Sequence, residues 1–78
     1  MAKKLDKLSN GTKVSTFFIS SDNSLVIMNL EVTDDKPVKI GGVDTIKCTN
    51  TNTQTTKTYS SKGLLKTHND LVASGQLS

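Results

Sequence analysis

The sequence has no tryptophan, no arginine, one cysteine, one proline and only three aromatic side chains in 78 residues. A single cysteine, Cys48, excludes an internal disulfide framework and a zinc site built from several cysteines. The absence of arginine removes the side chain that most often reads guanine, and the few aromatic rings limit stacking on bases. The sequence therefore argues against a disulfide-stabilised scaffold and a cysteine-rich metal site.

Long apolar segments are also missing. The longest uninterrupted apolar run, Leu25–Met28, has four residues, whereas a membrane-spanning helix needs roughly 18. No apolar stretch of about 7–15 residues follows the charged residues near the N-terminus, so we expect no secretory signal. These absences, with the lone cysteine, favour a cytoplasmic protein that makes no contact with a membrane.

The chain is long enough for one small domain. A chain of this size buries only about 60% of the surface that its unfolded form exposes, and hydrophobic residues make up 33% of the composition. Residues 1–9 show no sustained hydrophobic period and are expected to form a flexible N-terminal arm. Residues 10–78 are expected to form a single domain around one thin core.

Charge is segregated along the sequence. Residues 1–13 carry four lysines and one aspartate, residues 14–35 carry four carboxylates and no lysine, and residues 36–66 carry six lysines and one aspartate. Such asymmetry can steer a charged partner toward one surface. The alternative is that strand pairing brings the acidic and basic segments together, where they neutralise each other.

The first half of the chain predicts an antiparallel β-hairpin. Lys13–Ser20 reads as a strand, Ser21–Ser24 as a turn, and Leu25–Thr33 as a second strand with strict alternation. On the second strand one face takes Val26, Met28, Leu30 and Val32. Asp34–Pro37 is expected to break the chain, since proline removes a ladder donor and favours a turn.

The second half predicts a further hairpin and then a helix. A short strand is expected over Val38–Ile40, followed by a tight turn or a bulge at Gly41-Gly42 and a further strand over Val43–Thr49. A returning strand over residues 54–59 follows a polar hairpin tip at Asn50–Asn52. From Ser61 apolar residues follow a helical period, with Ser60 or Ser61 as N-cap and Gly75 at the C-terminal end. The predicted fold is α+β: a small antiparallel sheet of three to five strands packed against one C-terminal helix.

The residues that could carry chemistry favour no enzyme. His68 lies on the apolar stripe of the helix, which is typical of a buried structural histidine, and Cys48 shares a strand face with Ile46. Asp34 and Asp35 are adjacent and lack the alternate spacing of a calcium loop, and the Gly41-Gly42 pair lacks the features of a phosphate loop. We therefore expect no catalysis, no cofactor and no metal.

Binding to another macromolecule is the remaining hypothesis. We expect a non-catalytic module that docks on a protein partner and regulates or inhibits it by occlusion. A small chain of this kind has the general look of an accessory protein of a phage or mobile element. The alternative is a basic nucleic-acid-binding protein that uses hairpin 45–59 and the start of the helix. Homodimerisation through an edge strand would help so thin a core. The predicted contact residues are Lys47, Lys57, Tyr59 and Lys62, with a weaker acidic patch at Asp34 and Asp35.

Overall fold

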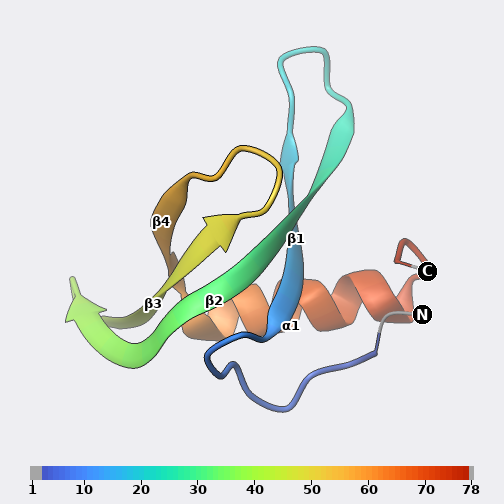
Figure 1. Ribbon diagram of the computed structural model, residues 1–78. Helices are drawn as coiled ribbons and strands as arrows, with labels where there is room; N and C mark the ends of the chain where they lie inside the picture. Colours follow the sequence, from blue (N-terminus) through green and yellow to red (C-terminus); the bar gives the residue numbers. More distant parts are fainter. Residues whose placement is uncertain (1–2, 78) are drawn as a thin grey trace.

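The computed structural model describes residues 3–77. It contains β1 (Lys13–Ile19), β2 (Leu25–Ile40), β3 (Val43–Asn50), β4 (Thr56–Ser60) and α1 (Ser61–Ala73) (Figure 1). The strands form one antiparallel sheet in the order β1-β2-β3-β4, so each strand pairs with its neighbour in sequence. The helix packs mainly against β1 at the base of the sheet. The predicted α+β architecture, a small antiparallel sheet with one C-terminal helix, is confirmed.

One face of the sheet forms the core with the helix. Strand alternation directs the apolar side chains of β1, β2 and β3 to this face, where Leu64 of α1 meets them. Leu5, Leu8 and Tyr59 pack against the edge of the cluster. The core residues are Val14, Leu30, Val32, Ile46, Cys48 and Leu64. A core of this size matches the thin one that the composition predicts.

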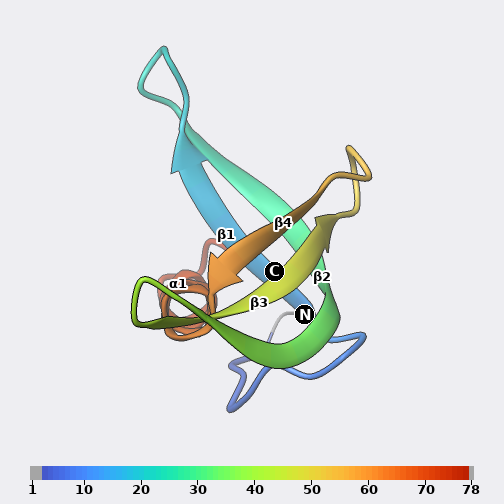
Figure 2. The ribbon, with the colours of Figure 1, turned by 90° about the vertical axis from the view of Figure 1, so that its left-hand side faces the viewer.

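Strand β2 is longer than the sequence predicts, and the expected break at Asp34–Pro37 is wrong. The strand continues to Ile40 through two register shifts, since Asp34 pairs with Lys47 while Val38 pairs with Thr45. The extra residues bulge out of the ladder, so the missing N–H of Pro37 leaves no gap in the pairing. β2 therefore bends sharply instead of ending, and it carries the chain around the base of the sheet (Figure 2).

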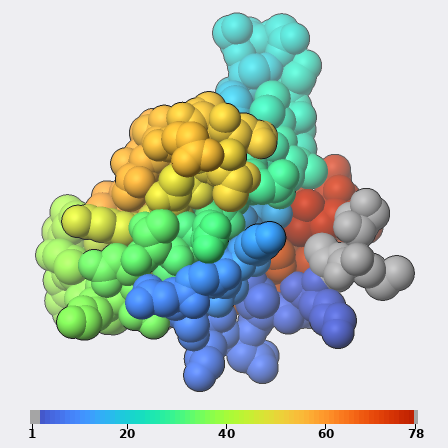
Figure 3. Space-filling view, in the orientation of Figure 1, coloured from blue at the N-terminus to red at the C-terminus, as the bar shows by residue number. Residues whose placement is uncertain are grey.

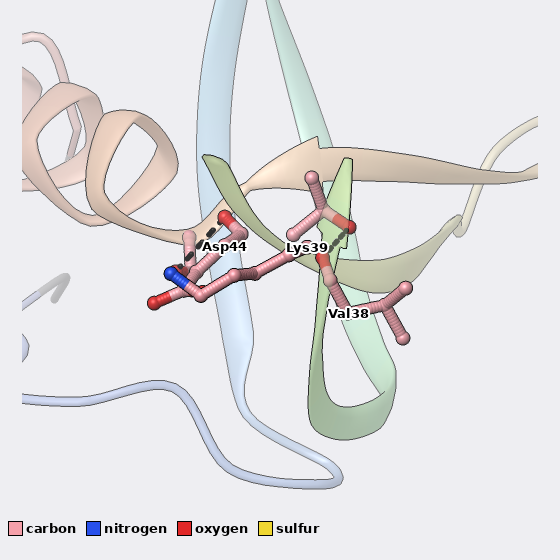
Figure 4. Close-up of polar contacts among 5 residues, drawn as sticks. Val38, Lys39 and Asp44 are labelled. Carbon is pink, nitrogen blue, oxygen red and sulfur yellow. Dashed lines mark hydrogen bonds and ion pairs between the residues drawn. The ribbon is translucent and has the colours of Figure 1, made fainter. Parts of the chain in front are cut away.

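The turn between β2 and β3 confirms its sequence signal. Gly41 and Gly42 have φ values of 59° and 82°, the positive range that a two-residue hairpin turn of this hand requires. Two side-chain contacts add to the backbone ladder of the flanking strands: Lys39 Nζ lies 3.5 Å from Asp44 Oδ1, and the Thr45 hydroxyl donates to the Val38 carbonyl at 2.8 Å (Figure 4). This turn thus joins β2 directly to β3.

Both ends of α1 are capped as expected. The Ser60 hydroxyl accepts a hydrogen bond from the Gly63 N–H at 3.2 Å, which satisfies a free donor of the first turn. Gly75 has a φ of 77°, and the N–H groups of Gly75 and Gln76 donate to the Val72 and Leu71 carbonyls. This pattern is a Schellman motif, which stops the helix.

The N-terminal segment runs along the helix without regular structure (Figure 1). The Asn69 side chain accepts from the Leu5 N–H at 2.7 Å and donates to the Leu5 carbonyl at 2.9 Å. His68 Nε2 donates to the Lys3 carbonyl at 2.8 Å. Two adjacent helix side chains therefore hold the backbone of this segment, whose flexibility stays a prediction.

Candidate binding groove

A concave groove of about 700 Å³ opens between the β1–β2 hairpin and the β3–β4 hairpin. The two hairpins diverge as separate arms on either side of it (Figure 2). One wall consists of Phe18, Val26 and Met28, and the other includes Lys57 and Tyr59. Its remaining lining residues are Ile27, Asn50, Asn52, Thr53 and Thr55.

The strand register explains why these residues meet. Phe18 pairs with Val26, and Thr16 pairs with Met28, so these side chains continue the face that carries Val14 and Leu30 in the core. On the other arm Tyr59 pairs with Ile46, and Lys57 pairs with Cys48. The groove is therefore the outer extension of the core face, with none of its lining residues contributed by the helix.

The groove combines an apolar wall with a polar rim. Phe18 is 44% exposed and Val26 is 36% exposed, which leaves large apolar side chains open to solvent. Lys57 is the one charged side chain in the lining, and the rim amides and hydroxyls come from the tip of the β3–β4 hairpin. Burial, and then the nearby Cys48 thiol, raise the pKa of the Tyr59 phenol, so this ring is neutral at physiological pH.

The opposite face of the β1–β2 hairpin is apolar as well. Phe17, Ile19 and Leu25 are 41%, 56% and 43% exposed, and all three lie on the side away from the groove by the same register. The end of this hairpin stands clear of the rest of the surface (Figure 3). The outer end of the β1–β2 hairpin thus exposes apolar side chains on both of its faces.

The predicted contact residues fall in three separate places. Lys57 and Tyr59 share the groove. Lys47 points to the opposite face of the sheet, because it pairs with Thr58 rather than with Lys57. Lys62 lines a smaller cavity of about 210 Å³ at the start of the helix. The structure therefore brings together two of the four residues on the predicted basic side.

Asp34 and Asp35, the predicted acidic patch, both form hydrogen bonds within the protein. Asp34 lies opposite Lys47 in the ladder, and its carboxylate accepts from the Lys36 N–H at 3.1 Å. Asp35 forms a reciprocal pair with Asn10, donating its N–H at 2.8 Å and accepting the Asn10 N–H at 3.3 Å. Strand pairing therefore brings acidic and basic segments side by side, but the ion pairs within residues 3–77, Lys39–Asp44 and Lys66–Asp70, include no carboxylate of residues 14–35.

His68 and Cys48 both occupy buried positions. His68 is 5% exposed, and both ring nitrogens bond to backbone groups of other segments. Cys48 is fully buried, and burial raises the pKa of its thiol to about 11, so the thiol stays protonated. Within residues 3–77 no three His, Cys, Asp or Glu side chains lie close enough together to hold a metal ion. In the same residues, no helix is both long and apolar enough to cross a membrane.

Comparison with protein-family models, with curated proteins and with solved structures finds no match for this chain.

The sequence interpretation missed the apolar wall of the groove. The signal was present in the runs Phe17–Ile19 and Leu25–Met28, where apolar residues do not alternate with polar ones. Continuous apolar runs in strands indicate that both faces of the strand are covered. In this fold nothing within residues 3–77 covers the outer ends of these runs, which are exposed.

Proposed function

We propose that this chain is a non-catalytic binding module that docks on a protein partner through the groove and regulates or inhibits that partner by covering part of its surface. The observation that carries the proposal is the apolar wall of a concave site with a polar rim, in which Phe18 and Val26 are exposed and Met28 is half-buried. Contiguous apolar surface with a polar border is typical of interaction sites on small proteins.

The chemistry of the lining favours a protein segment over other ligands. An apolar side chain of a partner would fill the space against Phe18 and Met28, while the rim amides would bond to its backbone. A buried, protonated thiol and a histidine engaged on both nitrogens supply no activated nucleophile or base near this site, which supports a role without catalysis. The single unpaired thiol also fits a reducing compartment such as the cytoplasm.

The test compares a groove variant with a matched control on the same strand. Val26→Thr removes apolar surface inside the groove, and Leu25→Thr removes similar apolar surface on the opposite face. Each of the three proteins is immobilised and used to capture partners from a cell lysate. A partner that binds the wild type and Leu25→Thr but not Val26→Thr would support the proposal. A capture profile that is identical for all three proteins would contradict it. Circular dichroism checks that both variants fold.

A second candidate is binding of a single-stranded nucleic acid in the same groove. The specific observation is that Lys57 and two aromatic rings, Phe18 and Tyr59, line one surface, since a cation beside stacking rings is the pattern such proteins use. Fluorescence anisotropy with labelled oligonucleotides at two salt concentrations tests it. Binding that weakens steeply with salt and falls in Lys57→Gln favours this candidate, and no binding at low salt excludes it.

A further inference from the structure

The outer edge of β1 has free backbone groups. β1 is the first strand of the sheet, and the Ser15 N–H points away from β2, because it donates to His68 Nδ1 at 3.0 Å. Backbone groups alternate in direction along a strand, so the N–H and C=O groups of Phe17 and Ile19 point the same way as those of Ser15. Among residues 3–77 no other segment bonds to these groups of Phe17 and Ile19.

Beyond Ser15, where His68 covers it, this edge carries none of the features that block strand addition. Proteins protect exposed edges with charges, prolines, bulges or a covering segment. From Val14 to Ser21 the chain has no charge and no proline, and the pairing of β1 with β2 has no register shift. His68 covers the edge at Ser15, and the exposed remainder at Phe17–Ile19 is open to another strand.

The two ends of the hairpin differ in charge: the turn carries Asp22, and the base carries Lys3 and Lys13 against Glu31, which lies opposite Lys13 in the ladder. Asp22, in the turn beyond β1, is the one ionisable residue between Val14 and Leu30. At the other end of β1 a cavity of about 520 Å³, lined by Ser15 and His68, has Lys3 and Lys13 among its lining residues. An antiparallel copy of the hairpin would bring its acidic turn to this basic end, and symmetry would repeat the contact.

We propose that two copies of this chain form a symmetric dimer in which the free edges of β1 pair antiparallel across a two-fold axis near Phe18. Phe17 of each copy pairs with Ile19 of the other, and the N–H and C=O groups of both residues are satisfied. Asp22 of each copy reaches Lys3 and Lys13 of the other. The exposed side chains of Phe17 and Ile19 become neighbours across the seam.

The other edge of the sheet is less suited to self-pairing. β4 has five residues and carries Lys57, and Lys62 follows in the first turn of the helix. Two copies joined along β4 would bring lysines together without an opposing carboxylate on that strand, and like charges across a seam oppose pairing. Length and charge therefore both favour β1.

The dimer has a consequence for the groove. Residues paired across antiparallel strands lie on the same face of the sheet, so the Phe18 side chains of the two copies would lie side by side on the groove face. Both grooves then open on the same side of one continuous sheet. The assembly would present two adjacent sites, which raises avidity for a partner with two binding segments. The dimer itself does not depend on what occupies the groove.

The first experiment measures molecular mass by sedimentation equilibrium over a range of protein concentrations. Ile19→Pro removes an outward N–H without touching the β1–β2 ladder, so it should abolish the dimer while the fold persists. Leu25→Thr is the control, because it removes an exposed apolar side chain beside Ile19 and leaves the β1 edge intact. Dissociation by Leu25→Thr but not by Ile19→Pro would indicate packing of hairpin faces and overturn edge pairing.

A charge exchange provides a second test that does not depend on proline. Lys13→Glu or Asp22→Lys alone should raise the dimer dissociation constant about five- to tenfold, since each reversal acts at two symmetric contacts. The double variant should recover most of the wild-type affinity. Failure of the double variant to recover, or a monomeric wild type at all concentrations tested, overturns the proposal. A dimer that forms without any effect of groove variants on partner capture would leave the dimer intact and contradict the proposed function alone.

Discussion

His68 and Ser15 are separated by 53 positions in the chain and joined by a buried hydrogen bond, in which the Ser15 N–H donates to His68 Nδ1 at 3.0 Å. Nε2 of the same ring donates to the Lys3 carbonyl at 2.8 Å. A neutral imidazole with its proton on Nε2 satisfies both contacts at once. The ring therefore ties the edge of β1 and the N-terminal segment to the helix.

Replacing His68 should destabilise the fold. His68→Ala leaves the buried Ser15 N–H without its acceptor, which costs about 1–3 kcal/mol before lost packing is counted. His68→Gln is the conservative comparison, because its amide can both accept and donate. Urea denaturation measures the free energy of unfolding. Equal stability of His68→Ala and the wild type would show that the bond contributes nothing.

The thiol of Cys48 should be unreactive in the folded protein. Cys48 is fully buried, and burial raises the pKa of its thiol to about 11, so little thiolate exists at pH 8 and a reagent cannot reach it. A colorimetric thiol reagent should react slowly with native protein and rapidly in denaturant. Fast, complete reaction of the native protein would contradict the buried position of this side chain.

The free energy of unfolding should fall as the pH rises above about 9. The folded state holds the Cys48 pKa at about 11, above the ordinary thiol value of 9.0, and also raises the pKa of Tyr59 above 10.0. Both groups therefore favour folding in their protonated forms. Their contribution to the free energy of unfolding is complete at pH values below the pKa that each group has in the unfolded chain. It is lost as the pH rises through the pKa that each group has in the folded protein. For the thiol this window runs from about pH 9 to about pH 11.

Thermal melts at stepped pH values check this prediction. The melting temperature should decline above pH 9, and Cys48→Ala should decline less steeply than the wild type. The slopes are compared rather than the melting temperatures, since removal of a buried sulfur also lowers stability at neutral pH. Parallel slopes would show that the thiol takes no part in the alkaline loss.

The sequence predicts the elements of this fold better than their lengths. Alternation at Val26, Met28, Leu30 and Val32 predicts the correct face of β2, because one buried face fixes which residues point inward. The Gly41-Gly42 turn, the Ser60 cap and Gly75 follow from local backbone chemistry, and each is confirmed. The failure at Asp34–Pro37 has a non-local cause, since the partner that satisfies Asp35 is Asn10, far away in the sequence.

In the candidate site, too, local sequence predicts some features and non-local pairing decides the others. Alternation alone places Lys57 and Tyr59 on one face, and the groove contains both. Lys47 is also a predicted contact residue, but the face on which it lies relative to Lys57 depends on the register between β3 and β4. A shift of one residue reverses the face, and the sequence contains no signal that fixes this register.

Tyr59 offers a direct test of the groove, because it is the one tyrosine in a chain without tryptophan. Its fluorescence therefore reports on a single site, and Lys57 lines the same groove. The lysine attracts anions at low ionic strength, so iodide should quench Tyr59 more strongly than caesium does. Lys57→Gln should reduce that preference, whereas Lys47→Gln, on the opposite face, should leave it unchanged. Equal quenching by the two ions in the wild type, or an equal effect of the two variants, would contradict the arrangement of Lys57 and Tyr59 in one groove.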